Sequence, residues 1–176
     1  MSEETGMKPQ RQSENARSFL DTIALTVDPD LRVESPMVAL ALETWDRLRG
    51  ARTMPAPADI DAVKLPIRLL PHLLLMDLEY QPAFRLRWRL IGTHITSVVD
   101  RDMTGRYWDE IYDARAFEEL TVGPLWVIEH RRPVRILGTA HYASKDYIRS
   151  ESVDMPLSSD GLTVDRILTV TVYDGS

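Results

Sequence analysis

The stretch FRLRWRL, residues 84–90, is the part of the sequence that decides the fold. Its apolar members are Phe84, Leu86, Trp88 and Leu90. They alternate with Arg85, Arg87 and Arg89. A period of two residues is the repeat of a β-strand with one buried face, so the pattern predicts a strand over residues 83–92 with the apolar set turned inward. A slip of one residue would bury three arginines, which fixes the predicted faces.

The preceding residues 72–80 are also rich in strand-forming side chains, and only Gln81 and Pro82 separate them from the arginine-rich strand. This spacing predicts a β-hairpin. Its inward residues are expected to be Leu74, Met76, Leu78 and Tyr80. The carboxylates of Asp77 and Glu79 would then lie across from the arginines on the solvated face.

Helical patterns follow the hairpin, with short pieces over residues 93–99 and 107–112 and a longer one from residue 113. Pro124 lies inside the longer piece and predicts a kink or a break over residues 120–124, because proline lacks a backbone donor. Gly105 marks a turn that favours a positive φ. Three further strands are expected over residues 133–143, 147–157 and 162–173. The predicted fold class is α+β, a five-stranded antiparallel sheet with helices packed on one face.

A helix is predicted over residues 35–49, with Ser35 as its N-cap, Pro36 in its first turn and Gly50 as its stop. One face of it is apolar and consists of Val38, Ala41, Leu42, Trp45 and Leu48. We expect this face to form a homodimer interface, and the alternative is that it folds back on the chain's own sheet.

Three regions are expected along the chain. Residues 1–34 are read as a mobile N-terminal tail, within which residues 19–27 form a short helix or an extended piece. Residues 35–71 hold the N-terminal helix and a connecting segment, and residues 72–176 form the core domain.

Composition excludes several classes of protein. The 176 residues carry a net charge of −6, which argues against a nucleic-acid partner, and they include no cysteine. Disulfides, cysteine nucleophiles and thiol adducts are therefore excluded. No apolar run reaches the roughly 20 residues of a membrane helix, and no secretory signal is present at the start, so a cytoplasmic location is expected.

No motif in the sequence predicts catalysis. The four histidines have no metal-ligand spacing, so no metal site is expected. Asp77 and Glu79 are read as part of a solvated sheet face rather than as an acid–base pair. Phosphate-binding glycine loops and serine-nucleophile motifs are absent, and we expect a protein that is not an enzyme.

Two short segments in the middle of the chain carry a family resemblance. Residues 89–93, Arg-Leu-Ile-Gly-Thr, are followed by Met-Thr-Gly-Arg at residues 103–106 and by Asp-Glu-Ile at residues 109–111. This order resembles PAS domains, in particular a bacterial PAS subfamily formerly classed as a domain of unknown function. In that subfamily a helix with a Trp and an Arg-rich end precedes the core, here at residues 45–50. The resemblance covers about residues 40–172.

The resemblance implies a sensory or regulatory module that binds a small ligand or a protein partner between the sheet and the helices. It implies signalling through a dimer interface to a separate output protein such as a signalling regulator. PAS relatives with adduct-forming flavin or haem use a Cys or a ligating His. This chain has no Cys and no histidine in such a pattern, so neither group is expected and the cofactor is unknown.

The candidate ligand site consists of interior positions that lie between the predicted sheet and the predicted central helices. These positions are Trp88, Leu90, Ile95, Trp108, Ile111, Phe117 and Ile136. Such a lining suits a small, mostly apolar ligand, or no ligand if the side chains close-pack. A ligand-free interaction adaptor is therefore one alternative. An enzyme on a cone-shaped fold of the ketosteroid-isomerase type is another, disfavoured because two strands precede the central helices.

Overall fold

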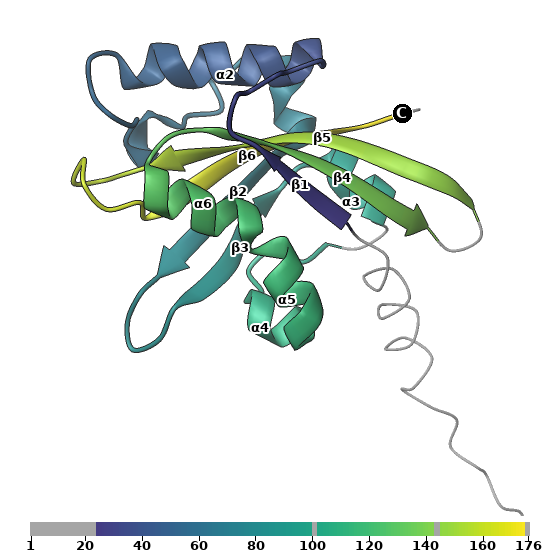
Figure 1. Cartoon of the computed structure of the whole chain (residues 1–176). Coiled ribbons are helices and arrows are strands. Elements are labelled where there is room, and N and C mark those ends of the chain that lie inside the picture. The colour runs from purple at the N-terminus through teal and green to yellow at the C-terminus, as the bar shows by residue number, and fades with distance from the viewer. Residues whose placement is uncertain (1–23, 100–101, 143–144, 175–176) are drawn as a thin grey trace, which may run out of the picture.

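The computed structural model describes residues 24–99, 102–142 and 145–174. Within them the chain forms one antiparallel sheet with helices on both faces (Figure 1). The strands are β1 (Ala24–Asp28), β2 (Leu73–Glu79), β3 (Arg85–Ile91), β4 (Val134–Tyr142), β5 (Lys145–Leu157) and β6 (Arg166–Tyr173). Their spatial order is β1-β4-β5-β6-β2-β3. The α+β antiparallel fold predicted from the sequence is confirmed.

The sheet has six strands rather than the predicted five. The additional strand, β1, pairs with β4 along one edge, from Ala24 opposite Thr139 to Asp28 opposite Arg135. Its residues fall in the stretch expected to be a tail, and they take the extended alternative proposed for residues 19–27. Residues 1–23 of that stretch lie outside the described residues.

The helices are α2 (Pro36–Arg49), α3 (Thr93–Val99), α4 (Trp108–Ile111), α5 (Ala114–Leu120) and α6 (Val122–His130). Two 3-10 helices, η1 (Pro57–Asp59) and η2 (Ile67–His72), join α2 to β2. The helical piece that contains Pro124 divides into α5 and α6 at Thr121, which confirms the predicted break. Gly105 has a φ of 83°, as its place in the turn before α4 predicted.

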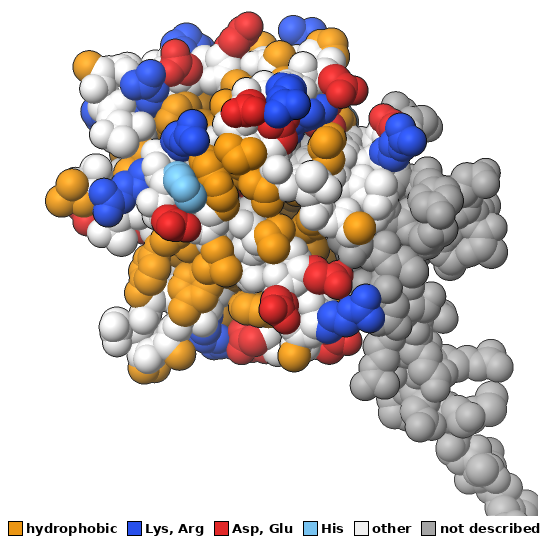
Figure 2. Space-filling model, in the orientation of Figure 1, with side chains coloured by type: hydrophobic (Ala, Val, Ile, Leu, Met, Phe, Trp, Pro, Cys, Tyr) orange, Lys and Arg blue, Asp and Glu red, His pale blue; other side chains and the backbone are white. Residues whose placement is uncertain are grey.

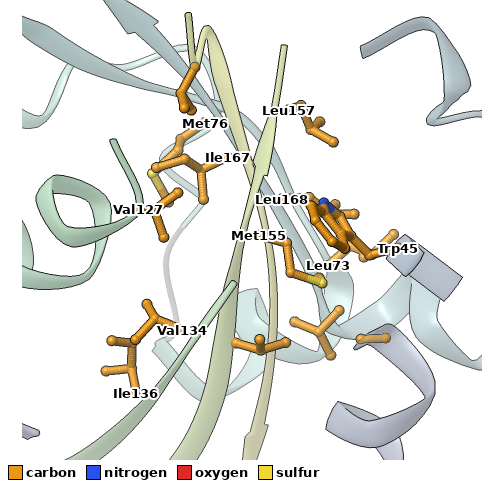
Figure 3. Close-up of a cluster of buried hydrophobic side chains, with 14 of the residues drawn as sticks. Trp45, Leu73, Met76, Val127, Val134, Ile136, Met155, Leu157, Ile167 and Leu168 are labelled. Carbon is orange, nitrogen blue, oxygen red and sulfur yellow. The ribbon is translucent and has the colours of Figure 1, made fainter. Parts of the chain in front are cut away.

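The helices that follow the hairpin, α3 to α6, lie on one face of the sheet as expected, and the N-terminal helix α2 covers the other face. In Figure 1, α2 lies on one side of the sheet and α4 to α6 lie on the other. We call these the outer and the inner face. The hydrophobic core divides in the same way (Figure 3), with Met76, Val127 and Ile167 on the inner side and Trp45 and Leu168 on the outer side. A sheet that is apolar on both faces must be covered on both.

Helix α2 folds back on its own sheet, the second of the two alternatives for this helix. Its boundaries are those predicted, since the Ser35 side chain accepts hydrogen bonds from the backbone N–H groups of Met37 and Val38 and the chain turns at Gly50. Val38, Ala41 and Trp45 are buried within the chain, and the Trp45 Nε1–H donates to the carbonyl oxygen of Pro156 at 2.8 Å. Leu42 and Leu48 are half-buried against the same core.

An ion cluster holds the start of α2 against the sheet. The Arg135 side chain is only 4% exposed and lies 2.8 Å from Glu151 and 3.2 Å from Asp28. Glu151 also accepts hydrogen bonds from the backbone N–H groups of Glu34 and Ser35. One buried arginine thus joins β1, β4, β5 and the N-terminus of α2.

The β2–β3 hairpin confirms the predicted faces up to Trp88 and corrects them beyond it. Asp77 pairs with Arg87 and Glu79 with Arg85, as predicted. A β-bulge then shifts the register, because Met76 pairs with Trp88 while Leu75 pairs with Leu90, so that Arg89 has no partner across the ladder. An extra residue in one strand reverses the faces of the residues that follow it.

The free edge of β3 is covered by the turn before α4. The Trp88 N–H donates to the Arg106 carbonyl at 3.0 Å, and the Gly105 N–H donates to the Trp88 carbonyl at 2.6 Å. These bonds satisfy backbone groups that an edge strand would otherwise expose, and they place α4 against the inner face.

Candidate ligand cavity

A cavity of about 200 Å³ lies between the inner face of the sheet and helices α3 to α6. Every strand contributes to its walls, and most of the lining side chains are apolar or aromatic. The apolar lining residues are Leu25, Leu74, Met76, Trp88, Ile91, Ile95, Met103, Trp108, Leu120, Pro124 and Ile136. The cavity is therefore built from residues that are distant in sequence and that meet only in the folded chain.

Four of the seven residues predicted for the ligand site line this cavity, and they are Trp88, Ile95, Trp108 and Ile136. The other three do not. Leu90 is 45% exposed because the bulge at Arg89 turns it to the outer face, and Ile91 takes the inward position instead. Ile111 and Phe117 are half-buried and pack against the core outside the cavity lining, with the Phe117 ring 6.4 Å from that of Trp108.

Aromatic side chains form one end of the cavity. The ring centroids of Trp88 and Trp108 are 4.8 Å apart, and Tyr112 meets Trp108 edge-on at 5.6 Å. The Trp88 Nε1–H donates to the Tyr112 hydroxyl at 3.3 Å. The Trp108 Nε1–H is buried and has no hydrogen-bond partner among the described residues.

A ladder of polar side chains runs along β5 and β6 on the cavity wall. The cross-strand pairs are Ser150 with Tyr173, Ser152 with Thr171, and Asp154 with Thr169. Two of the pairs are hydrogen-bonded through their side chains, Thr171 Oγ1 to Ser152 Oγ at 3.0 Å and Thr169 Oγ1 to Asp154 Oδ1 at 2.6 Å. These residues were not predicted as site residues, although their alternation with apolar neighbours was visible in the sequence.

Asp154 is the buried carboxyl group of this ladder. The residue is 5% exposed, and its side chain lies between Thr169 and Gly123. Burial raises its pKa from 3.8 to about 6, against the lowering effect of the hydrogen bond from Thr169. No ion pair involves Asp154 within the described part of the chain.

Two glycines bring the walls of the cavity close together. A methyl group at Gly123, in the first turn of α6, would meet Asp154 Oδ2 and the side chain of Ile136. At Gly138 it would meet the hydroxyl group of Ser150. The absence of a side chain at these positions lets α6 and β4 approach the polar ladder.

The described chain also matches a known family. A family model described as a PAS domain matches residues 33–172, which contain α2 and all the described cavity-lining residues except Leu25 and Tyr173. The chain belongs to the PAS family. Membership points to a sensory or interaction module. A search of curated proteins found no match to the chain.

Outside the polar ladder, Asp77, His72 and His94 are further ionisable groups near the sheet. Burial alone would raise the pKa of Asp77, but Arg87, Arg166 and Arg89 on the outer face lower it. The His72 and His94 rings lie 4.4 Å apart, and within the residues 24–99, 102–142 and 145–174 no cluster of three metal-ligating side chains occurs. No helix in the described part of this PAS domain has the length and apolar character needed to cross a bilayer.

Proposed function

We propose that this PAS domain is a sensor that binds a small, mostly apolar molecule in the cavity between the sheet and α3 to α6. The observation that carries the proposal is the cavity itself, because a concave apolar lining with a few convergent polar groups is the usual form of a ligand site. Its size is sufficient, since an apolar cavity of about 150 Å³ can hold benzene. Trp88, Ile95, Trp108 and Ile136 are the proposed apolar contacts.

The position of the cavity also supports a route by which a bound ligand affects α2 on the opposite face of the sheet. Strands β5 and β6 carry the polar ladder on their inner face and contact α2 on their outer face. A ligand that displaces these strands would therefore act on α2, and from there on a second copy or on a separate output protein. Homodimerisation stays a prediction, and it would involve surfaces other than Val38, Ala41 and Trp45, which are buried within the chain.

Native mass spectrometry of the freshly purified full chain tests the proposal, because one spectrum reports both a bound small molecule and the number of subunits. The matched variants are Ile136→Phe, which places a bulkier ring in the cavity wall and narrows the cavity, and Ile111→Phe, which makes the same change outside the cavity lining. We expect a bound mass in the natural chain and in Ile111→Phe, and its loss in Ile136→Phe. A bound mass that Ile136→Phe retains would contradict the proposed site.

A ligand-free interaction adaptor is the second candidate function. Hydrophobic side chains gather on the face of the molecule where α6 lies (Figure 2), and Leu125 and Val122 of α6 are 50% and 37% exposed. Apolar side chains grouped on a surface favour a protein contact. The adaptor predicts that no small molecule copurifies and that Leu125→Glu, but not Ile136→Phe, removes a protein contact.

A further inference from the structure

The strongest unexplained feature of the molecule is the carboxyl group of Asp154. Among the described lining residues it is the one acidic side chain, and none of the others is lysine, arginine or histidine. The other ionisable lining residues are Tyr112 and Tyr173, and burial raises the pKa of Tyr173 to about 12, so Tyr173 stays neutral near pH 7. The described lining of the cavity thus combines mostly apolar side chains with a single carboxyl group.

The geometry leaves half of this carboxyl group available. Oδ1 accepts the hydroxyl hydrogen of Thr169 at 2.6 Å. Oδ2 lies against Gly123. The next residue in the chain, Pro124, has no backbone N–H and so donates no hydrogen bond to the carboxyl group. Among the described residues, the only hydrogen bond to Asp154 is the one from Thr169.

A buried carboxylate without a cation is costly, and a partner that brings both a positive charge and N–H donors offsets that cost. Charge-assisted N–H to carboxylate hydrogen bonds are about twice as strong as neutral ones. An anionic ligand would be repelled at the same position. The charge of the cavity therefore selects the chemical class of its ligand.

We propose that the molecule bound in the cavity carries a protonated amine, or an equivalent cationic N–H group, that pairs with Asp154 Oδ2, while its apolar part lies against Trp88 and Trp108. This inference rests on the proposed function, since it names the ligand class of the same cavity. Ser152, in the cross-strand pair next to that of Asp154, also lines the cavity.

Three probes with the same aromatic ring but different head groups test the proposal on the full chain. They are benzylamine, which is cationic near pH 7, benzyl alcohol, which is neutral, and benzoate, which is anionic. Binding is measured by titration calorimetry and by the fluorescence of the cavity tryptophans. We expect benzylamine to bind at least about tenfold more tightly than benzyl alcohol, and benzoate to bind more weakly than either.

The matched variants separate charge from shape. Asp154→Asn keeps the size of the side chain and removes its charge, so we expect it to weaken benzylamine by about tenfold or more and to change benzyl alcohol by less than about threefold. Thr171→Val alters a neighbouring polar lining residue and is expected to leave the preference for benzylamine unchanged. In the natural chain, benzylamine binding should weaken as the pH falls from about 7.5 to about 5, because Asp154 becomes protonated while the amine remains charged.

Each outcome decides between the two proposals. If benzyl alcohol binds as tightly as benzylamine, or if Asp154→Asn leaves benzylamine binding unchanged, the cationic ligand is refuted and the cavity remains a ligand site. If none of the three probes binds, the sensor proposal is refuted together with this inference. If Asp154→Asn does not fold, the pH series on the natural chain gives the decision, and binding that is flat with pH refutes the pairing.

Discussion

Replacing Asp154 with asparagine in the ligand-free protein should change how stability depends on pH. An increase in the pKa from 3.8 to about 6 means that the folded state disfavours the charged form by about 3 kcal/mol, at about 1.4 kcal/mol for each tenfold change in proton affinity. Asparagine cannot ionise, so the variant is free of this cost at every pH. It retains an oxygen that can accept the hydrogen bond from Thr169.

The sign of the effect follows from the direction of the pKa change. Because the folded pKa of Asp154 is raised, the folded state binds more protons than the unfolded state between pH 3.8 and about 6. The contribution of Asp154 to stability is therefore fully present below pH 3.8 and is lost as the pH rises through about 6. Relative to the natural chain, Asp154→Asn should gain between about 1 and about 2 kcal/mol from about pH 5 to about pH 8.

Thermal and urea unfolding at the two pH values measure this gain as a difference between variant and natural chain, so effects common to both cancel. For a chain of this length the gain corresponds to a relative increase in Tm of about 3–6 °C. Thr171→Val is the control, because it alters the same ladder without removing an ionisable group, and its effect should not depend on pH. A difference between Asp154→Asn and the natural chain that is constant from about pH 5 to about pH 8 would refute the reasoning.

Four further substitutions test the architecture. Trp88→Asp, which places a charge on the inner face, should abolish the folded circular dichroism spectrum, whereas Arg87→Glu on the outer face should leave it intact; loss of the fold in Arg87→Glu alone would invert the assigned faces. Trp45→Ala should lower the free energy of unfolding in urea by about 3–5 kcal/mol at every protein concentration, since Trp45 packs within its own chain, and a loss that grows on dilution would place it in a dimer interface instead. Arg135→Ala should lower the same free energy by about 3–5 kcal/mol by leaving Glu151 and Asp28 without their buried partner, and a loss below about 1 kcal/mol in urea unfolding would show that the ion cluster does not hold α2 to the sheet.

Much of the local structure could be read from the sequence because it depends on local rules. The alternation of residues 84–88 sets the faces of β3, and the facing carboxylates of Asp77 and Glu79 set the hairpin register. Ser35 and Gly50 mark the ends of α2, and Pro124 separates α5 from α6. Each of these signals is contained within a few residues, so no tertiary contact is needed to interpret it.

The candidate site could be predicted only in part, because a bulge and a distant strand alter it. Nothing in residues 89–91 indicates that Arg89 is the extra residue, since a bulge is a relation between two strands, and the change removes Leu90 from the cavity and adds Ile91. The sequence left the segment of strand β1 as either a helix or an extended piece, because a short edge strand depends on the partner that it meets. Its Leu25 nevertheless lines the cavity.

The burial of the polar ladder is the feature that the sequence alone could least predict. Ser152 and Asp154 alternate with Val153 and Met155, and the sequence by itself determined that this part of β5 has one polar and one apolar face. Such alternation usually means that the polar face meets water. Here the apolar face is covered by α2 and the polar face is enclosed by α6, so only the tertiary structure decided that the carboxyl group of Asp154 is buried. A period of two residues distinguishes the faces of a strand, but which of them is buried depends on the helices that cover each face.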